Sequence, residues 1–189
     1  MAKFKGEFRV ESSRLKSWDY STPGWYFVTI CVKDNKNCFG AVDDYNVKLN
    51  NIGEIVELFW KEIPDHYNFV ELDEFVVMPD HFHAIIILNE QSNVEVKHKK
   101  NINNVETGHA PSLRIKRTIT LGNIIGSFKS AVTKNIYKNC HLNFSWQTRF
   151  YDRIIRNERE LFNIRKYISQ NPLKWELDKD SPSNCVFDK

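Results

Sequence analysis

The sequence predicts an α+β sandwich in which helices pack on an antiparallel sheet. One observation is the order of its patterned segments, which reads strand, helix, strand, strand, helix, strand, helix. The other is size: 189 residues, 41% of them hydrophobic, suffice for one packed domain. We expect a single domain over residues 1–175, with a polar loop at 89–117 and an acidic tail at 176–189.

The first patterned segment is a strand and the second is a helix. The run WYFVTICV at Trp25–Val32 is rich in β-branched and aromatic residues, which predicts a buried strand. From Asn46 to Ile63 apolar residues recur at helical spacing until Pro64 stops the pattern. This predicts an amphipathic helix over 46–63.

A β-hairpin is predicted next. Tyr67–Met78 alternates between apolar and polar residues, Pro79-Asp80 forms a turn, and HFHAIIIL at His81–Leu88 returns as a second strand. Residues 89–117 then show no apolar periodicity, which indicates an exposed loop.

The second half supplies a helix, a strand and a last helix. One apolar stripe runs from Thr120 to Lys138, and Arg149–Arg156 forms a short apolar strand segment. Asn157 begins a capped helix that we expect to end at Asn171-Pro172. The complete order is that of a ferredoxin-like or RRM-like sandwich, with helices on one face of the sheet and an extra C-terminal helix.

Charge is distributed unevenly along the chain. Lys and Arg number 9 against 14 Asp and Glu in residues 1–88, but 10 against 3 in residues 120–175. A basic region of this kind is typical of a protein that binds a polyanion, because each neutralised phosphate releases counterions. A solvated basic face would give the same count.

Neither membrane insertion nor export is indicated. The longest apolar run is Ala84–Leu88, and the first residues are charged throughout. The four cysteines form no C-x-x-C pair, which favours reduced thiols. We therefore expect a cytoplasmic protein without a membrane partner.

Two groups of residues could carry chemistry. His81 and His83 are two apart on a strand, so both imidazoles can reach one metal ion while Phe82 faces the other way. Tyr167 and Asn171 are four apart on the edge of the last helix. For each group the alternative is structural: hydrogen-bonded histidines on a sheet face, a packed tyrosine, and an asparagine that ends a helix.

Three motifs occur together in a particular order. They are MPDHFH, then WQ-x-x-F-Y-D-R-x-x-R-N, then Y-x-x-x-N-P. With the upstream segment SRLKSWDYSTPGWYFVTICV, they resemble the REP-associated tyrosine transposases, which are single-tyrosine HUH transposases. The resemblance spans Ser13–Trp175 and is weakest in the polar loop.

The resemblance implies a role for each matching residue. His81 and His83 match the metal-binding histidines, Asn171 falls at the position of a polar third ligand, and Tyr167 matches the nucleophile. The implied metal is Mg²⁺ or Mn²⁺, although two imidazoles alone would also suit zinc. The implied substrate is single-stranded DNA beside a hairpin, cleaved and rejoined through a 5′-phosphotyrosine intermediate during DNA transposition. A bacterial, nucleoid-associated protein follows, as a monomer or a homodimer.

Basic residues are candidates for contacts with DNA phosphates. These candidates are Lys129, Lys134, Arg149, Arg153, Arg156, Arg114, Lys116 and Arg117, the last three in the polar loop. Trp146 and Gln147 match a W-Q pair of the family, where the indole serves either core packing or base stacking. Tyr137 and Tyr151 are rival nucleophiles that lack an asparagine at the matching offset.

Two other functions fit the same residues. A domesticated, non-catalytic relative would bind hairpin DNA without forming a covalent adduct. A zinc hydrolase would use His81 and His83 with a third ligand from Asp80 or Glu74.

Overall fold

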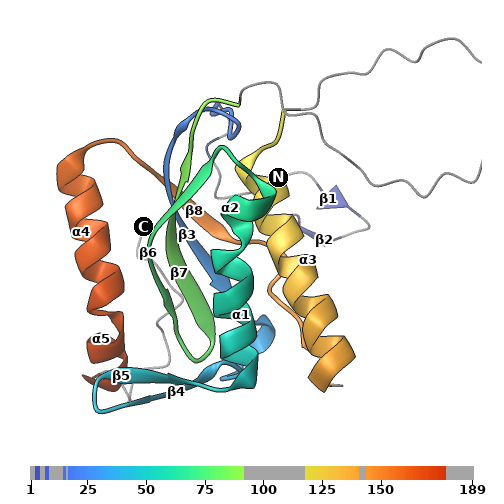
Figure 1. Ribbon diagram of the computed structural model, residues 1–189, viewed down its shortest axis with the longest axis vertical. Coiled ribbons are helices and arrows are strands. Elements are labelled where there is room, and N and C mark those ends of the chain that lie inside the picture. Colours follow the sequence, from blue (N-terminus) through green and yellow to red (C-terminus); the bar gives the residue numbers. More distant parts are fainter. Residues whose placement is uncertain are drawn as a thin grey trace, which may run out of the picture.

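A four-stranded antiparallel sheet forms the centre of the protein. The structure, a computed structural model, describes residues 3–4, 7–8, 15, 17–91, 118–140 and 144–177. The strands are β3 (Gly24–Cys31), β6 (Val70–Val77), β7 (His81–Leu88) and β8 (Tyr151–Ile155), in the spatial order β6-β7-β3-β8. All three pairings are antiparallel, and the two strands of the predicted hairpin are neighbours. The predicted ferredoxin-like α+β sandwich is confirmed (Figure 1).

One face of the sheet carries the main core. Helices α1 (Asn51–Lys61) and α3 (Leu121–Cys140) lie on this face, and the single-turn helix α2 (Ile63–His66) follows α1. Aromatic rings join the three layers: Trp60 of α1 lies 4.8 Å from Phe82 of β7 and 5.3 Å from Phe128 of α3, between ring centroids.

The other face is covered by helix α4 (Glu158–Ser169), which Figure 1 shows across the sheet from α1 and α3. This is the extra C-terminal helix that the sequence predicted, and it lies on the face opposite the other two long helices. Its buried Ile164 and Ile168 pack with Phe27 and Ile85 of the central strands. The reason lies in β7, whose run of isoleucines is apolar on both faces, so both faces need a cover.

The predicted helix over 46–63 is wrong at its beginning. A hairpin of β4 (Gly40–Asp43) and β5 (Asn46–Leu49) precedes α1, and its turn residues Asp44 and Tyr45 have positive φ angles of 49° and 59°. The helix starts after Asn50, whose side chain accepts hydrogen bonds from the backbone N–H groups of residues 52 and 53. This N-cap satisfies donors that the first helical turn leaves open.

The expected end of the last helix at Asn171-Pro172 is also wrong. Helix α4 ends at Ser169, and a second helix, α5 (Asn171–Leu177), begins at Asn171. Pro172 lies in the first turn of α5, where a helix needs no N–H donor. The chain is therefore helical through Leu177, two residues into the segment we expected to be a tail.

The remaining elements are short. Strands β1 (Lys3–Phe4) and β2 (Glu7–Phe8) pair with each other, and a 3₁₀ turn spans Lys33–Asn35. The described cysteines, at positions 31, 38 and 140, are free thiols. Within the described ranges, no helix combines the length and the hydropathy that crossing a bilayer requires.

Candidate active site

The two histidines of the sheet lie side by side on its α4 face. In the β-ladder His81 pairs with Cys31 and His83 pairs with Thr29, while Phe82 between them points into the main core. The imidazole centroids are 4.5 Å apart, and both residues are fully buried. The strand geometry that the sequence predicted is therefore present.

Each histidine uses its Nδ1 atom for a buried contact. Nδ1 of His81 lies 2.5 Å from the carboxylate of Asp80, and Nδ1 of His83 lies 2.8 Å from the hydroxyl of Thr29. Asp80 and Thr29 are themselves 7% and 2% exposed. Such contacts fix the orientation and tautomer of an imidazole, and they leave Nε2 as the nitrogen that each ring can offer to a metal.

Tyr167 reaches this pair from α4. Its hydroxyl oxygen is 3.2 Å from Nε2 of His83, and its ring meets Phe27 edge-on at a centroid distance of 6.1 Å. The ammonium group of Lys174 lies 5.0 Å from the centre of the same ring. The structure thus brings a phenol to the nitrogen on which a metal would be expected.

Helix α5 continues the same side of the site. Trp175 packs against His81, with 5.7 Å between ring centroids, and Asn171 is buried at 7% exposure. Asn171 comes four residues after Tyr167 and is the first residue of α5. Glu176 accepts a hydrogen bond of 2.5 Å from the backbone N–H of Tyr45 and so fastens α5 to the β4–β5 turn.

Burial determines the charge state of His83. Desolvation holds its pKa well below the usual range of histidine, and the neighbouring charge of His81 acts in the same direction. His83 is therefore neutral at pH 7, and the neutral imidazole is the form that binds metal ions.

The side chains of His81, His83 and Asn171 are of types that divalent metal ions accept as ligands. Two imidazoles with supporting hydrogen bonds and one amide oxygen suit Mn²⁺ better than Mg²⁺, which prefers oxygen ligands. Among the residues that the structure describes, no three His, Cys, Asp or Glu side chains gather as a metal site. A zinc hydrolase would require Asp80 or Glu74 as a third ligand. Asp80 instead contacts Nδ1 of His81, and Glu74 is exposed on β6.

The three candidate tyrosines occupy different places. Tyr137 lies on α3, across the sheet from the histidines, and is 73% exposed. Tyr151 lies on β8 opposite Thr29, with strand β3 between it and His83, and is 43% exposed. Tyr167 contacts His83 of the pair through its hydroxyl group.

The W-Q pair belongs to the packing around α3. Trp146 is 8% exposed, lies 5.0 Å from Phe144 between ring centroids, and donates from Nε1 to the carbonyl of Lys129. Lys129 in turn donates from Nζ to the carbonyl of Gln147 at 2.6 Å, and burial lowers its pKa. The structure therefore shows core packing for Trp146 and an internal hydrogen bond for Lys129.

The other basic candidates lie on exposed surfaces. Lys134 is on α3, Arg149 precedes β8, and Arg153 and Arg156 lie on β8 and the turn after it. Arg114, Lys116 and Arg117, with the rest of 92–117, lie outside the described residues.

Sequence reasoning missed three contributors to the site. Thr29 and Trp175 carried no signal, because their roles depend on strand pairing and on helix α5. Asp80 directly precedes the histidine, and the structure makes it the partner of His81 instead of the third metal ligand that the zinc alternative requires.

Comparison with known proteins supports the resemblance seen in the motifs. A Haemophilus influenzae protein named "Uncharacterized protein" is 38% identical over 169 residues, which cover 89% of this chain and 91% of the relative. A second protein of that organism, named "Putative REP-associated tyrosine transposase", is 26% identical over 179 residues, covering 87% and 80%. No protein-family model matches the chain.

A solved structure shares the fold. It is a REP-associated tyrosine transposase bound to a REP hairpin, with a TM-score of 0.52 and 19% identity over 91% of this chain and 81% of that one. The chain shares the fold of that structure, and its motifs resemble those of the REP-associated tyrosine transposases. It belongs to the family of the 38% identical Haemophilus influenzae protein.

Proposed function

We propose that the protein is a metal-dependent single-stranded DNA endonuclease and strand transferase, acting beside REP-like hairpins in DNA transposition. The observation that carries this proposal is the contact between the hydroxyl of Tyr167 and Nε2 of His83. It joins the family's nucleophile position to its metal-binding position. The structural relative bound to a REP hairpin supports hairpin DNA as the substrate.

The reaction exchanges one phosphoester for another. The phenolic oxygen of Tyr167 attacks the scissile phosphorus and loses its proton to solvent, forming a tyrosine–phosphate bond. The bond from phosphorus to the 3′ oxygen breaks, and that oxygen takes a proton and leaves as a free 3′-hydroxyl. The 5′-phosphotyrosine link conserves the phosphoester, so a 3′-hydroxyl can reverse the step without a nucleotide cofactor.

His81, His83 and Asn171 would hold the metal ion, Mn²⁺ or Mg²⁺. When bound, the ion neutralises charge on the scissile phosphate, which a phenol with a reference pKa near 10 requires at neutral pH. The other residues position these groups: Asp80 and Thr29 orient the imidazoles, and Phe27 supports the ring of Tyr167.

The test uses labelled single-stranded hairpin oligonucleotides from the DNA that flanks the gene. They are incubated with Mn²⁺ or Mg²⁺ and run on a denaturing protein gel. We expect a metal-dependent shifted band from the wild type and from Tyr151→Phe and Tyr137→Phe, and no band from Tyr167→Phe.

Two outcomes would contradict the proposal in different ways. A band that survives Tyr167→Phe and disappears in Tyr151→Phe would move the nucleophile to β8. Salt-sensitive binding of the hairpins without any adduct would favour the non-catalytic DNA-binding protein.

A further inference from the structure

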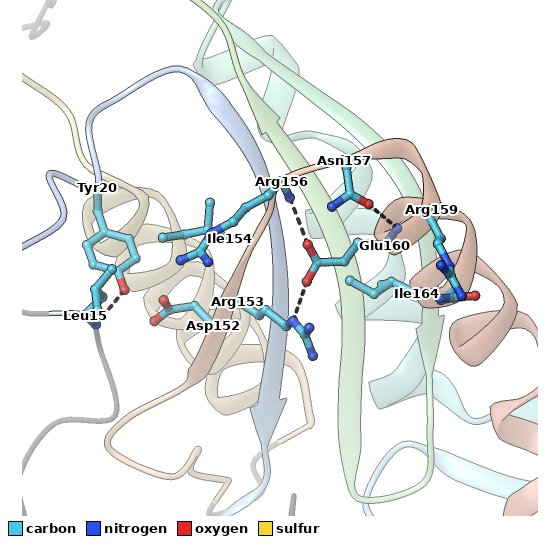
Figure 2. Close-up of a pocket in the computed structure, with 11 residues that line it drawn as sticks. Leu15, Tyr20, Asp152, Arg153, Ile154, Arg156, Asn157, Arg159, Glu160 and Ile164 are labelled. Atoms are coloured by element: carbon cyan, nitrogen blue, oxygen red, sulfur yellow. Dashed lines mark hydrogen bonds and ion pairs between the residues drawn. The ribbon is translucent and has the colours of Figure 1, made fainter. Parts of the chain in front are cut away.

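A pocket of about 620 Å³ lies at the open edge of the sheet, where β8 ends and α4 begins. Three parts of the chain line it: the segment before β3, strand β8, and the first two turns of α4 (Figure 2). Its volume falls within the range of small-ligand sites.

Three arginines surround one carboxylate in this pocket. Figure 2 shows the guanidinium group of Arg153 at Glu160, with the side chains of Arg156 and Arg159 on opposite sides of that carboxylate. Glu160 accepts from Nε of Arg153 at 2.6 Å and from the backbone N–H of Arg156 at 2.9 Å. Glu160 thus joins β8 to α4 and balances the charge of Arg153.

The other two guanidinium groups are available to a ligand. Arg156 and Arg159 are both exposed, and neither side chain is in an ion pair within the described part of the chain. Guanidinium groups bind phosphate oxygens through paired N–H donors. Asn163 adds an amide to the same lining, and the N-terminal end of α4 adds a partial positive charge. This chemistry fits a phosphodiester.

Two elements, α4 and β8, connect the pocket with Tyr167 and His83. On α4, Glu160 and Tyr167 are seven residues apart, so they share a face about 10 Å apart along the axis. On β8, Arg153 and Tyr151 are two apart and share a face, and Tyr151 pairs with Thr29 beside His83. A strand of DNA seated on the arginines would therefore lie along the exposed edge of β8 and α4 in the direction of Tyr167.

We propose that this pocket binds the single-stranded DNA adjacent to the cleavage site through two phosphodiesters, one at Arg156 and one at Arg159. The inference rests on the proposed function, because it assumes that single-stranded DNA is the substrate. It assigns Arg159 and Asn163 a place in substrate binding and makes Glu160 a positioning residue.

The first experiment measures binding rather than cleavage. In a Tyr167→Phe background, fluorescence anisotropy compares Arg156→Gln/Arg159→Gln with Lys48→Gln/Lys61→Gln, which removes equal charge from β5 and α1. The probe is a hairpin oligonucleotide with single-stranded flanks. For two single-strand phosphates we expect the salt slope of log K to fall by roughly 1.4, or about 25-fold in affinity per tenfold change in salt. The lysine variant keeps the wild-type slope.

A second experiment locates the phosphates. Neutral methylphosphonate linkages are placed one at a time along the flanks. In the parent protein we expect a loss of affinity at one or two positions next to the cleavage site. In Arg156→Gln/Arg159→Gln the same linkages cost nothing further, because the interaction is already absent. Arg156→Lys/Arg159→Lys, which retains charge, recovers part of the slope and shows that the fold is intact.

The outcomes separate this inference from the proposed function. Equal slopes for the arginine variant and its parent, or equal methylphosphonate losses in both, overturn the inference and leave the catalytic proposal standing. The expected binding losses without a phosphotyrosine band from the wild type support the inference and refute catalysis. A parent protein that binds none of the oligonucleotides overturns both.

Discussion

Thr29→Val tests whether the sheet orients the candidate metal ligand. The substitution keeps the shape of the side chain and removes the hydroxyl that lies 2.8 Å from Nδ1 of His83. Thr29 is 2% exposed and His83 is fully buried, so water cannot replace the hydroxyl without a rearrangement. Losing a buried partner costs about 1–3 kcal/mol in the free energy of unfolding, and we expect about 2 kcal/mol.

The same substitution should weaken metal binding. Removing the group that orients a histidine ligand typically costs about 10–100-fold in metal affinity. Urea unfolding followed by tryptophan fluorescence gives the stability of the metal-free protein, and calorimetric titration with Mn²⁺ gives the affinity. The two measurements are independent, because unfolding is followed without metal.

Thr133→Val is the matched control. The hydroxyl of Thr133 donates to the carbonyl of Lys129 within α3, across the sheet from the histidines. We expect this change to stay within about 0.5 kcal/mol. If Thr29→Val destabilises no more than Thr133→Val and Mn²⁺ binds both equally, the assigned role of Thr29 is refuted.

Three further predictions concern the frame around the site. Nε of Arg165 donates to Asp73 at 2.8 Å and holds the pKa of that carboxyl below its usual value. The pair therefore stabilises the fold fully above the unfolded-state pKa of Asp73, and this stabilisation is lost as the pH falls through the folded-state pKa. In urea unfolding across pH, Asp73→Asn should cost about 0.5–1 kcal/mol at pH 7 and progressively less toward pH 3. Trp146→Ala should lower the free energy of unfolding by about 3–5 kcal/mol because it empties a packed site, whereas reduced DNA affinity at unchanged stability would identify a stacking platform. Asn50→Ala removes the cap of α1 and should cost about 1 kcal/mol in the same unfolding assay; no change would contradict the observed start of the helix.

The sequence predicted the strands well where the pattern of apolar residues matched a strand and did not also match a helix. Strand β7 has the bounds that we expected, because its isoleucine run and the preceding Pro-Asp turn leave no alternative. The segment from Asn46 was ambiguous, since Val47 and Leu49 fit the start of a helix as well as an alternating strand. The deciding feature was the turn at Asp44 and Tyr45, where the backbone is left-handed without a glycine to signal it.

The sequence indicated which residues form the candidate site, but not which of them are in contact. The apolar stripe of α4 indicated a buried face that includes Ile164 and Ile168, yet a stripe does not specify which side of a sheet it covers. The contact between Tyr167 and His83 exists because α4 lies opposite α1 and α3. The partner of Nδ1 in His83 follows from the register of β3 and β7, which local pattern does not fix.

The two faces of the sheet differ in how firmly they hold their helices. On the α4 face the buried cluster is small, with Phe27, Ile85, Ile155, Ile164 and Ile168, whereas β7 lies in the extensive core that α1 and α3 share. Detaching α4 therefore exposes little apolar surface and leaves that core whole. In hydrogen exchange we expect the amides of α4 to open at lower free energy than those of β7. We therefore expect Tyr167, the proposed nucleophile, to lie on an element that opens more readily than the strand that carries His81 and His83.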